Sequence, residues 1–174
     1  MTAPAETLAR LSARLGQALS EQHLMLATAE SCTAGGIAFA VTLTPGSSRW
    51  FDRGFVTYTN ESKQQMLGVA PAYLRDFGAV SEPVARAMAL GALTQSTAQV
   101  AVAVTGIAGP DGGSESKPVG TVCFAWAIRR EPAQPAWVRT QTSRFDGDRA
   151  AVRTQSIVLA LETLVGLLTQ RQDV

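Results

Sequence analysis

The chain has 174 residues, 46% of them hydrophobic, and a formal net charge of +1. Its length and apolar fraction predict a single domain, 1–174, with a sizeable core, and the near-zero charge argues against a nucleic-acid partner, because nucleic-acid-binding surfaces are strongly basic. Two distant cysteines and a single histidine cannot assemble a Cys/His metal site, so we expect no metal.

Hydrophobic periodicity predicts a helix at the start of the chain. Leu8, Leu11 and Leu15 recur at helical spacing within residues 5–20. This amphipathic segment lacks the basic start and the apolar centre of a signal peptide, and no stretch reaches the roughly 18 uncharged apolar residues of a membrane-spanning helix. We therefore expect a cytoplasmic protein without a membrane partner.

The rest of the chain alternates predicted strands and helices. Strands are expected at residues 23–29, 54–59, 100–104, 119–128 and 137–145. Helices are expected at residues 33–43, 61–68, 71–77, 82–97 and 147–170. Asn60 and Ser81 have the side chains that cap helix starts. Strands that alternate with helices at first and follow one another directly at the end predict a three-layer α/β/α sandwich with a mixed sheet.

A polar cluster, Glu30-Ser31-Cys32-Thr33, stands where the first of these strands meets a predicted helix. In α/β sheets, ligands bind where strand ends turn into helices, and a helix that begins just after Ser31 would point free backbone N–H groups at a developing oxyanion. The other interpretation is that Ser31 or Thr33 only caps the helix, which is a frequent role of these residue types. Both interpretations are open at this point.

A serine nucleophile needs a base, and few residues of this chain can serve as one. His23, the only histidine, precedes the strand and therefore lies at the end opposite Ser31, which excludes a Ser-His-Asp triad. The chain has two lysines, Lys63 and Lys117, and Lys63 falls in the first turn of a predicted helix, where the dipole and burial both disfavour an ammonium. Lys63 is the candidate base, with Tyr58 as its helper. Alternatively, Lys63 is a solvated surface lysine and Tyr58 is a half-buried aromatic residue of a strand.

Two further segments are candidates for binding an anion or a ribose. A loop after the strand at 100–104 contains Thr105, Gly106, Gly109, Gly112 and Gly113, and its backbone amides could approach a ligand closely. The loop matches neither the Walker pattern nor GxGxxG, and a flexible turn is its alternative. Arg149 and Arg153 stand one turn apart near the last helix start, as in a phosphate fork, although a solvated helix face has the same pattern.

Several long motifs occur together and in order: TAESCTAGG, LTPGSSRWFDRGFVTYTNESKQQMLGV, AVSEPVARAMA, VTGIAGPDGG, KPVGTV and FDGDRAAVR. They cover nearly the whole chain, which resembles the CinA C-terminal domain family. The resemblance implies an α/β/α sandwich, a homo-oligomer (a dimer or larger), and no redox cofactor or obligatory metal. It also implies hydrolysis of nicotinamide mononucleotide to nicotinic acid mononucleotide and ammonia, in pyridine-nucleotide (NAD) salvage. Two departures, Asp111 and the SES segment before Lys117, bear on the shape of the glycine-rich loop.

The resemblance also favours catalysis over capping for Ser31. It implies that Ser31 attacks the carboxamide carbon, while Lys63 takes the hydroxyl proton and returns it to the leaving ammonia, with Tyr58 assisting. The amides of Cys32 and Thr33 would then hold the oxyanion. Cys32 is also a rival nucleophile.

The remaining candidates are assigned to the substrate. Glu30 is expected to orient the base or a ribose hydroxyl, and Ser48 in the PGSS segment is a rival nucleophile or a ligand. Ribose and phosphate are assigned to Thr105 and the glycine loop. Arg149 or Arg153 is expected to contact the phosphate.

Two other functions fit the same sequence. The chain could be a catalytically silent nucleotide-binding module associated with competence, or an amidase for another nucleotide amide. Intact Ser31 and Lys63 argue against the silent module, and only assays separate the two amidases.

Overall fold

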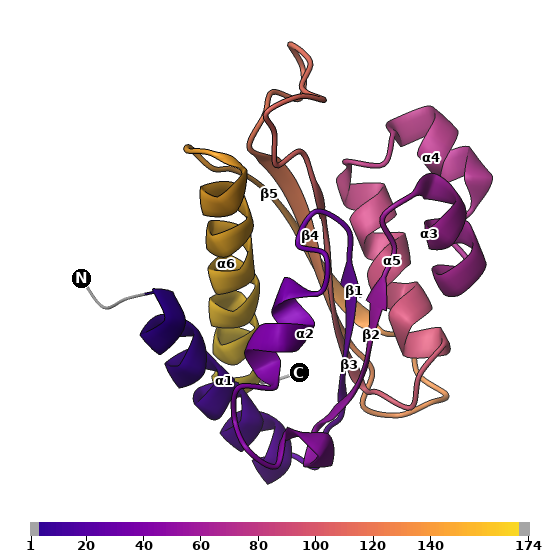
Figure 1. Cartoon of the computed structure of the whole chain (residues 1–174). Coiled ribbons are helices and arrows are strands. Elements are labelled where there is room, and N and C mark those ends of the chain that lie inside the picture. Colours follow the sequence, from indigo (N-terminus) through magenta and orange to yellow (C-terminus); the bar gives the residue numbers. More distant parts are fainter. Residues whose placement is uncertain (1–3, 171–174) are drawn as a thin grey trace.

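The computed structural model describes residues 4–170, in which five strands form one sheet between two layers of helices (Figure 1). Residues 1–3 and 171–174 of the predicted domain lie outside the described part. The strands are β1 (Leu26–Glu30), β2 (Phe51–Val56), β3 (Val100–Gly106), β4 (Thr121–Ile128) and β5 (Trp137–Arg144). Their order is β2-β1-β3-β4-β5, with β2, β1 and β3 parallel and with β4 and β5 antiparallel to their neighbours. The predicted mixed sheet and three-layer architecture are confirmed.

The helices divide between the two faces of the sheet. They are α1 (Pro4–Glu21), α2 (Gly36–Val41), α3 (Asn60–Leu67), α4 (Pro71–Phe77), α5 (Glu82–Thr94) and α6 (Arg149–Thr169), with a short 3₁₀ turn at Ser47–Arg49. Helices α1, α2 and α6 pack together on one face, whereas α5 covers the other face and carries α3 and α4 on its outer side (Figure 1).

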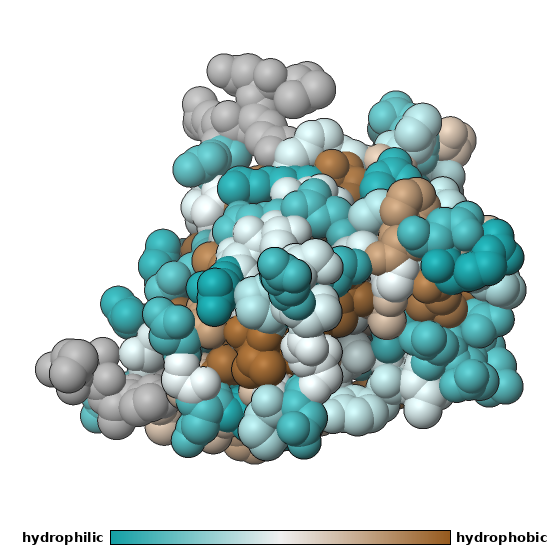
Figure 2. Space-filling view, turned by 90° about the horizontal axis from the view of Figure 1, so that it is seen from above, coloured by the Kyte–Doolittle hydropathy of each residue, from teal (hydrophilic) through white to brown (hydrophobic). Residues whose placement is uncertain are grey.

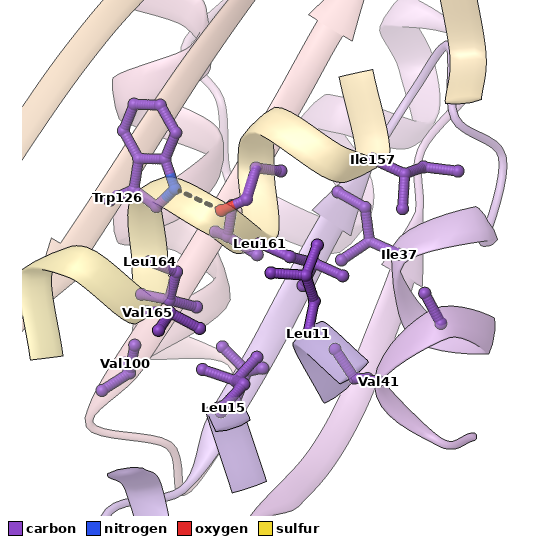
Figure 3. Packing of buried hydrophobic residues seen from close by; sticks show 14 of the residues in the cluster. Leu11, Leu15, Ile37, Val41, Val100, Trp126, Ile157, Leu161, Leu164 and Val165 are labelled. Atoms are coloured by element: carbon purple, nitrogen blue, oxygen red, sulfur yellow. Dashed lines mark hydrogen bonds between the residues drawn. The ribbon is translucent and has the colours of Figure 1, made fainter. Parts of the chain in front are cut away.

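The larger of two hydrophobic clusters fills the space under α1, α2 and α6. Figure 3 shows Leu11 of α1 beside Leu161 of α6, with Leu15 lower in the same cluster, toward Val100 and Val165. The indole of Trp126 is fully buried in this cluster, and its Nε1 donates a hydrogen bond of 3.0 Å to the carbonyl of Ala160. The one polar atom of this large side chain is therefore paired, as burial requires.

The opposite face of the sheet is lined by small side chains. Because successive strand residues point to opposite faces, three neighbouring strands each present alanines toward α5: Ala27, Ala29, Ala101, Ala103, Ala125 and Ala127. All of these alanines are fully buried. Short side chains let α5 lie close to the sheet, and α3 packs against α5 in turn.

Helix α6 is long and apolar enough to span a membrane by length and composition alone. Nine of its residues are buried, and eight of these belong to the larger core cluster. A helix that is apolar on most sides is either a core helix or a membrane span. Because α6 packs into the core, its apolar composition is explained as that of a core helix.

Several helix starts differ from the sequence prediction, and two of them bear on the site. The helix expected at 33–43 begins only at Gly36, because Ala34 and Gly35 adopt positive φ angles of 49° and 88° that interrupt helical geometry. The cap of α3 is Thr59 rather than Asn60. Thr59 and Ser62 form a reciprocal capping box, in which each side chain accepts a hydrogen bond from the other residue's backbone N–H.

Two helices agree closely with the prediction, whereas strand β2 is shifted by three residues. Helix α4 covers the predicted residues 71–77, and Ser81 caps α5 as expected, by accepting a hydrogen bond from the amide of Val84. Strand β2 begins at Phe51, three residues before the predicted start, and ends at Val56. As an edge strand it pairs only with β1 and is half-exposed, so its apolar pattern is weak in the sequence.

Gly91 provides a test of the close contact between α5 and α3. A Cβ atom at this position would collide with the carbonyl oxygen of Leu67, at the end of α3. We expect Gly91→Ala to lower the free energy of unfolding by about 1–3 kcal/mol, measured by thermal or urea denaturation. Gly166→Ala in α6 is the matched control, since a Cβ there meets no atom within 4 Å. That variant should be neutral or stabilised by up to about 1 kcal/mol, because alanine favours the helix. Equal stability of the two variants would contradict the close contact.

Candidate active site

Three hydroxyl residues stand in one row at the carboxyl ends of the parallel strands. The amide of Ser31 donates to the carbonyl of Val104 (2.9 Å), and the amide of Thr57 donates to the carbonyl of Glu30 (2.8 Å). The ladder of β2, β1 and β3 thus continues one residue beyond the paired strands. Thr57, Ser31 and Thr105 occupy neighbouring positions in this row, and strand alternation directs them to the alanine-lined face. Seen from above, this end of the molecule has a mostly hydrophilic surface (Figure 2).

Lys63 reaches this row from the first turn of α3. Its Nζ donates to the Oγ of Ser31 (3.1 Å) and to the carbonyl of Thr57 (2.8 Å). Both side chains are buried, with 1% of Lys63 and 8% of Ser31 exposed. Burial lowers the pKa of Lys63, because a desolvated ammonium is disfavoured. A buried amine in contact with a serine hydroxyl is the arrangement that general-base activation of a nucleophile requires.

Cys32 is buried and stays a neutral thiol. Desolvation raises the pKa of its thiol to about 12, and no described hydrogen bond joins the thiol to Lys63. The thiolate is the reactive form of cysteine, so a thiol of this kind is inert near neutral pH. The geometry therefore favours Ser31 over its predicted rival Cys32 as nucleophile.

The carboxylate of Glu30 is occupied by helix α2. It accepts hydrogen bonds from the amides of Ile37 (2.9 Å) and Ala38 (2.8 Å), and the hydroxyl of Thr28 donates to it at 3.2 Å. None of its described hydrogen bonds involves Lys63. The expectation that the free amides of this helix point at the site is wrong, because the helix begins later and Glu30 caps it.

The free donors beside Ser31 lie in the turn between β1 and α2. Within the described residues, the amides of Cys32 and Thr33 donate to no other residue, whereas the amide of Ala34 closes the turn on the carbonyl of Ser31 (3.0 Å). The carbonyl of Thr33 accepts a hydrogen bond from the guanidinium of Arg153 (3.1 Å). Two neighbouring amides that no other residue occupies can stabilise an oxyanion when they lie next to a nucleophile.

Arg149 connects three segments that are far apart in the sequence. Its guanidinium donates to the hydroxyl of Tyr58 (2.6 Å) and to the carbonyl of Gly109 (2.9 Å). Tyr58 is 54% exposed, and its described hydrogen bond is to Arg149 rather than to Lys63. The structure thus places Tyr58 with Arg149 and the glycine loop, beside the Ser31–Lys63 pair rather than within it.

The glycines of the loop serve close packing. A Cβ at Gly109 or Gly113 would come within 2.6 or 2.8 Å of Val119, and one at Gly106 within 2.7 Å of Val122. Gly112 has space around it but adopts a positive φ of 91°. These residues fold the loop against itself above the sheet (Figure 1).

Thr105 lies in the hydroxyl row, and its Oγ1 donates to the carbonyl of Ala79 (2.8 Å) before α5. Ser48, in contrast, is exposed in the 3₁₀ turn that precedes β2. The six residues of β2 separate it from the carboxyl end of the sheet, a span of about 20 Å. The expectation that Ser48 is a rival nucleophile or ligand is wrong for this reason.

Thr57 was missed by sequence reasoning. Its hydroxyl is fully buried in the same row as Ser31, and its carbonyl holds Lys63. Its position directly before the candidate Tyr58 is the sequence signal that could have pointed to it. Its place beside Ser31, however, follows from the register between β1 and β2, which the sequence alone does not show. Among the described residues, no three His, Cys, Asp or Glu side chains gather as metal ligands.

Comparisons with known proteins identify the family of the chain. The family model of the CinA C-terminal domain matches residues 8–168. The nicotinamide-nucleotide amidohydrolase PncC of Escherichia coli K12 is 53% identical over 157 residues, which cover 90% of this chain and 92% of that protein. The PncC of Pseudomonas putida is 47% identical over 165 residues, covering 95% and 99%. The crystal structure of the competence/damage inducible protein CihA from Agrobacterium tumefaciens superposes with a TM-score of 0.86 at 46% identity, covering 94% and 96% of the two chains.

The titration of Lys63 can be measured directly, because the chain has only two lysines. With ¹³C-labelled lysine, NMR should show two side-chain signals, and Lys117→Arg assigns them. We expect the Lys63 signal to titrate below the usual value of about 10.4, because burial disfavours the ammonium. The neutral amine then exists at a lower pH than in a free lysine. A midpoint at or above about 10.4 would contradict a desolvated base.

Proposed function

Since the chain belongs to the CinA C-terminal domain family, we propose that it hydrolyses the carboxamide of nicotinamide mononucleotide, giving nicotinic acid mononucleotide and ammonia. The chain is an amidohydrolase by its similarity to relatives of that name along almost their whole length. The observation that carries the mechanism is the 3.1 Å hydrogen bond between Lys63 Nζ and Ser31 Oγ in a buried site.

The first half of the reaction forms an acyl-enzyme. Ser31 Oγ attacks the carboxamide carbon as its proton passes to the neutral amine of Lys63, and the carbonyl electron pair moves to oxygen. The amides of Cys32 and Thr33 stabilise this oxyanion. The Lys63 ammonium then gives its proton to the amide nitrogen, the C–N bond breaks and ammonia leaves.

The second half of the reaction releases the acid. Lys63, again neutral, takes a proton from a water molecule as its oxygen attacks the ester carbon. The second tetrahedral intermediate uses the same two amides. When it collapses, the proton on Lys63 returns to Ser31 Oγ, and nicotinic acid mononucleotide dissociates.

The ribose and the phosphate of the substrate are assigned to the end of β3, the glycine loop and the first turns of α6. Arg149 and Arg153 form no described ion pair, and their hydrogen bonds go to neutral oxygen atoms. A phosphate is a stronger acceptor for a guanidinium than a carbonyl or a phenol, so it can displace them. Glycines 109 and 112 and the hydroxyl of Thr105 are the proposed ribose and phosphate neighbours. A role in NAD salvage, a cytoplasmic location and a homo-oligomeric state remain predictions.

The two alternative functions make different demands on the site. A silent binding module has no need of a buried amine against Ser31, and the 1% exposure of Lys63 favours catalysis for that reason. An amidase for another nucleotide amide would use the same residues and differ only in its preferred substrate.

Removal of either member of the pair should abolish turnover. We expect Ser31→Ala and Lys63→Ala each to lower kcat by about 10³-fold or more, and the double variant to lose little beyond that, because the two side chains act as one unit. The measurement is ammonia release from nicotinamide mononucleotide with a chelator present. Ser48→Ala, at the other end of β2, is the control and should retain activity. Additive losses from the two single variants would refute the shared mechanism.

Phosphate recognition by Arg149 can be separated from catalysis. We expect Arg149→Gln to raise KM for the mononucleotide by about tenfold or more while changing KM for the phosphate-free riboside little, because a charge-assisted contact is lost only with the first. Arg75→Gln is the control for loss of an arginine charge, since Arg75 is exposed and its described ion pair is with Asp76. Equal effects on both substrates would remove Arg149 from the phosphate site.

A further inference from the structure

The hydroxyl of Thr57 has an unusual environment. It is fully buried and has no hydrogen-bond partner in the described part of the chain. Buried hydroxyl groups are normally paired, because an unmade hydrogen bond costs free energy, and exceptions call for an explanation. The backbone of the same residue is fixed on both sides, since its amide donates to Glu30 and its carbonyl accepts from Lys63.

The count of donors on Lys63 leaves one N–H without an acceptor. An ammonium has three N–H groups, and the two acceptors on Lys63 are Ser31 Oγ and the Thr57 carbonyl. Water cannot replace the third acceptor easily, because Lys63 is 1% exposed. One donor and one acceptor, on residues already in contact, are thus both unpaired.

The missing contact matters most in the first tetrahedral intermediate. Ser31 Oγ is then bonded to the former carboxamide carbon and is a poorer acceptor, so the ammonium formed during attack keeps the Thr57 carbonyl as its main acceptor. A single contact leaves the long lysine side chain free to turn away from the leaving nitrogen. A second acceptor near the Thr57 carbonyl would hold the ammonium and its proton in place.

We propose that Thr57 is a positioning residue whose Oγ1 accepts the third N–H of the Lys63 ammonium during the acyl-enzyme half of the reaction. The proposal rests on the proposed function, because it assumes that Lys63 is the base. The change it needs is small. Rotation about χ1 of Thr57 moves Oγ1 among staggered positions while the backbone stays fixed.

Thr33 has the other unpaired buried hydroxyl in the described structure. No described hydrogen bond connects Thr33 with Lys63, and its carbonyl is bound instead by Gly36 and by Arg153 of α6. Thr57 is therefore the residue whose free acceptor is tied to the base.

Kinetics of Thr57→Val and Thr57→Ser test the proposal. Valine keeps the shape of threonine and removes the hydroxyl, so we expect kcat for nicotinamide mononucleotide to fall about 10- to 100-fold with KM within about twofold. Serine keeps the hydroxyl and should restore kcat to within a few-fold. Ser156→Ala is the control for loss of a buried hydroxyl, because Ser156 bonds the Val152 carbonyl within α6, and it should retain kcat. If Thr57→Val proves unstable on heating, Thr57→Ala makes the same comparison.

The lysine titration gives a second readout that does not need turnover. The proposed contact forms when Lys63 is an ammonium, which the titration also produces in the free protein. Loss of the Thr57 hydroxyl therefore disfavours the protonated state, and the Lys63 midpoint should fall in Thr57→Val and return in Thr57→Ser. Cys32 is the titratable group whose charge acts on Lys63, and its thiol, with a pKa of about 12, is neutral over the lower part of the titration.

The outcomes separate the two proposals. Unchanged kcat in Thr57→Val, or a loss that serine does not restore together with an unchanged Lys63 midpoint, would overturn the role of Thr57 and leave only packing. If the unmodified protein releases no ammonia, the proposed function fails. The titration then still decides whether the hydroxyl contacts the amine.

Discussion

The site depends on a buried amine that is surrounded by neutral groups. Lys63 donates to a serine hydroxyl and a backbone carbonyl, and no carboxylate pairs with it among the described residues. Such an environment stabilises an ammonium less than water does, so burial both lowers the pKa of Lys63 and makes the folded state less stable than an apolar residue would. The surrounding structure must therefore hold the amine in place, because a free lysine would turn toward solvent.

The alanine-lined face of the sheet is what makes that possible. Helix α3 has only eight residues, too few to be stable alone, so its position depends on the Thr59–Ser62 capping box and on packing against α5. Helix α5 can lie close to the sheet because three strands present alanines to it, and Gly91 brings it against the end of α3. The small residues of the core thus determine where the lysine enters the site.

Sequence reasoning predicted the architecture well because it rests on local signals. Periodicity and turn residues located the elements, and the scarcity of lysine and histidine pointed to Lys63 as the partner of Ser31. Features that depend on register were not predictable in the same way. The row that joins Ser31 to Thr57 exists only because β1 pairs with β2 in one register. Ser48 was assigned to the substrate on its polar segment alone, although it precedes this strand and so lies at the opposite end of the sheet. The role of Glu30 as a cap was hidden by the turn at Ala34, whose positive φ is uncommon for a residue other than glycine.

Two neighbouring residues, Thr57 and Tyr58, connect the regions proposed to bind the two ends of the substrate. Thr57 holds the base through its carbonyl, and the next residue, Tyr58, is held by Arg149, the proposed phosphate ligand. In this structure the guanidinium is satisfied by a phenol and a carbonyl, which are weaker acceptors than a phosphate. On the proposed function, a phosphate that binds Arg149 competes with Tyr58 for the same N–H groups and so acts on the segment that positions Lys63. Binding energy from the non-reacting phosphate can then contribute to the orientation of the base, which is how remote substrate groups raise kcat rather than only lower KM.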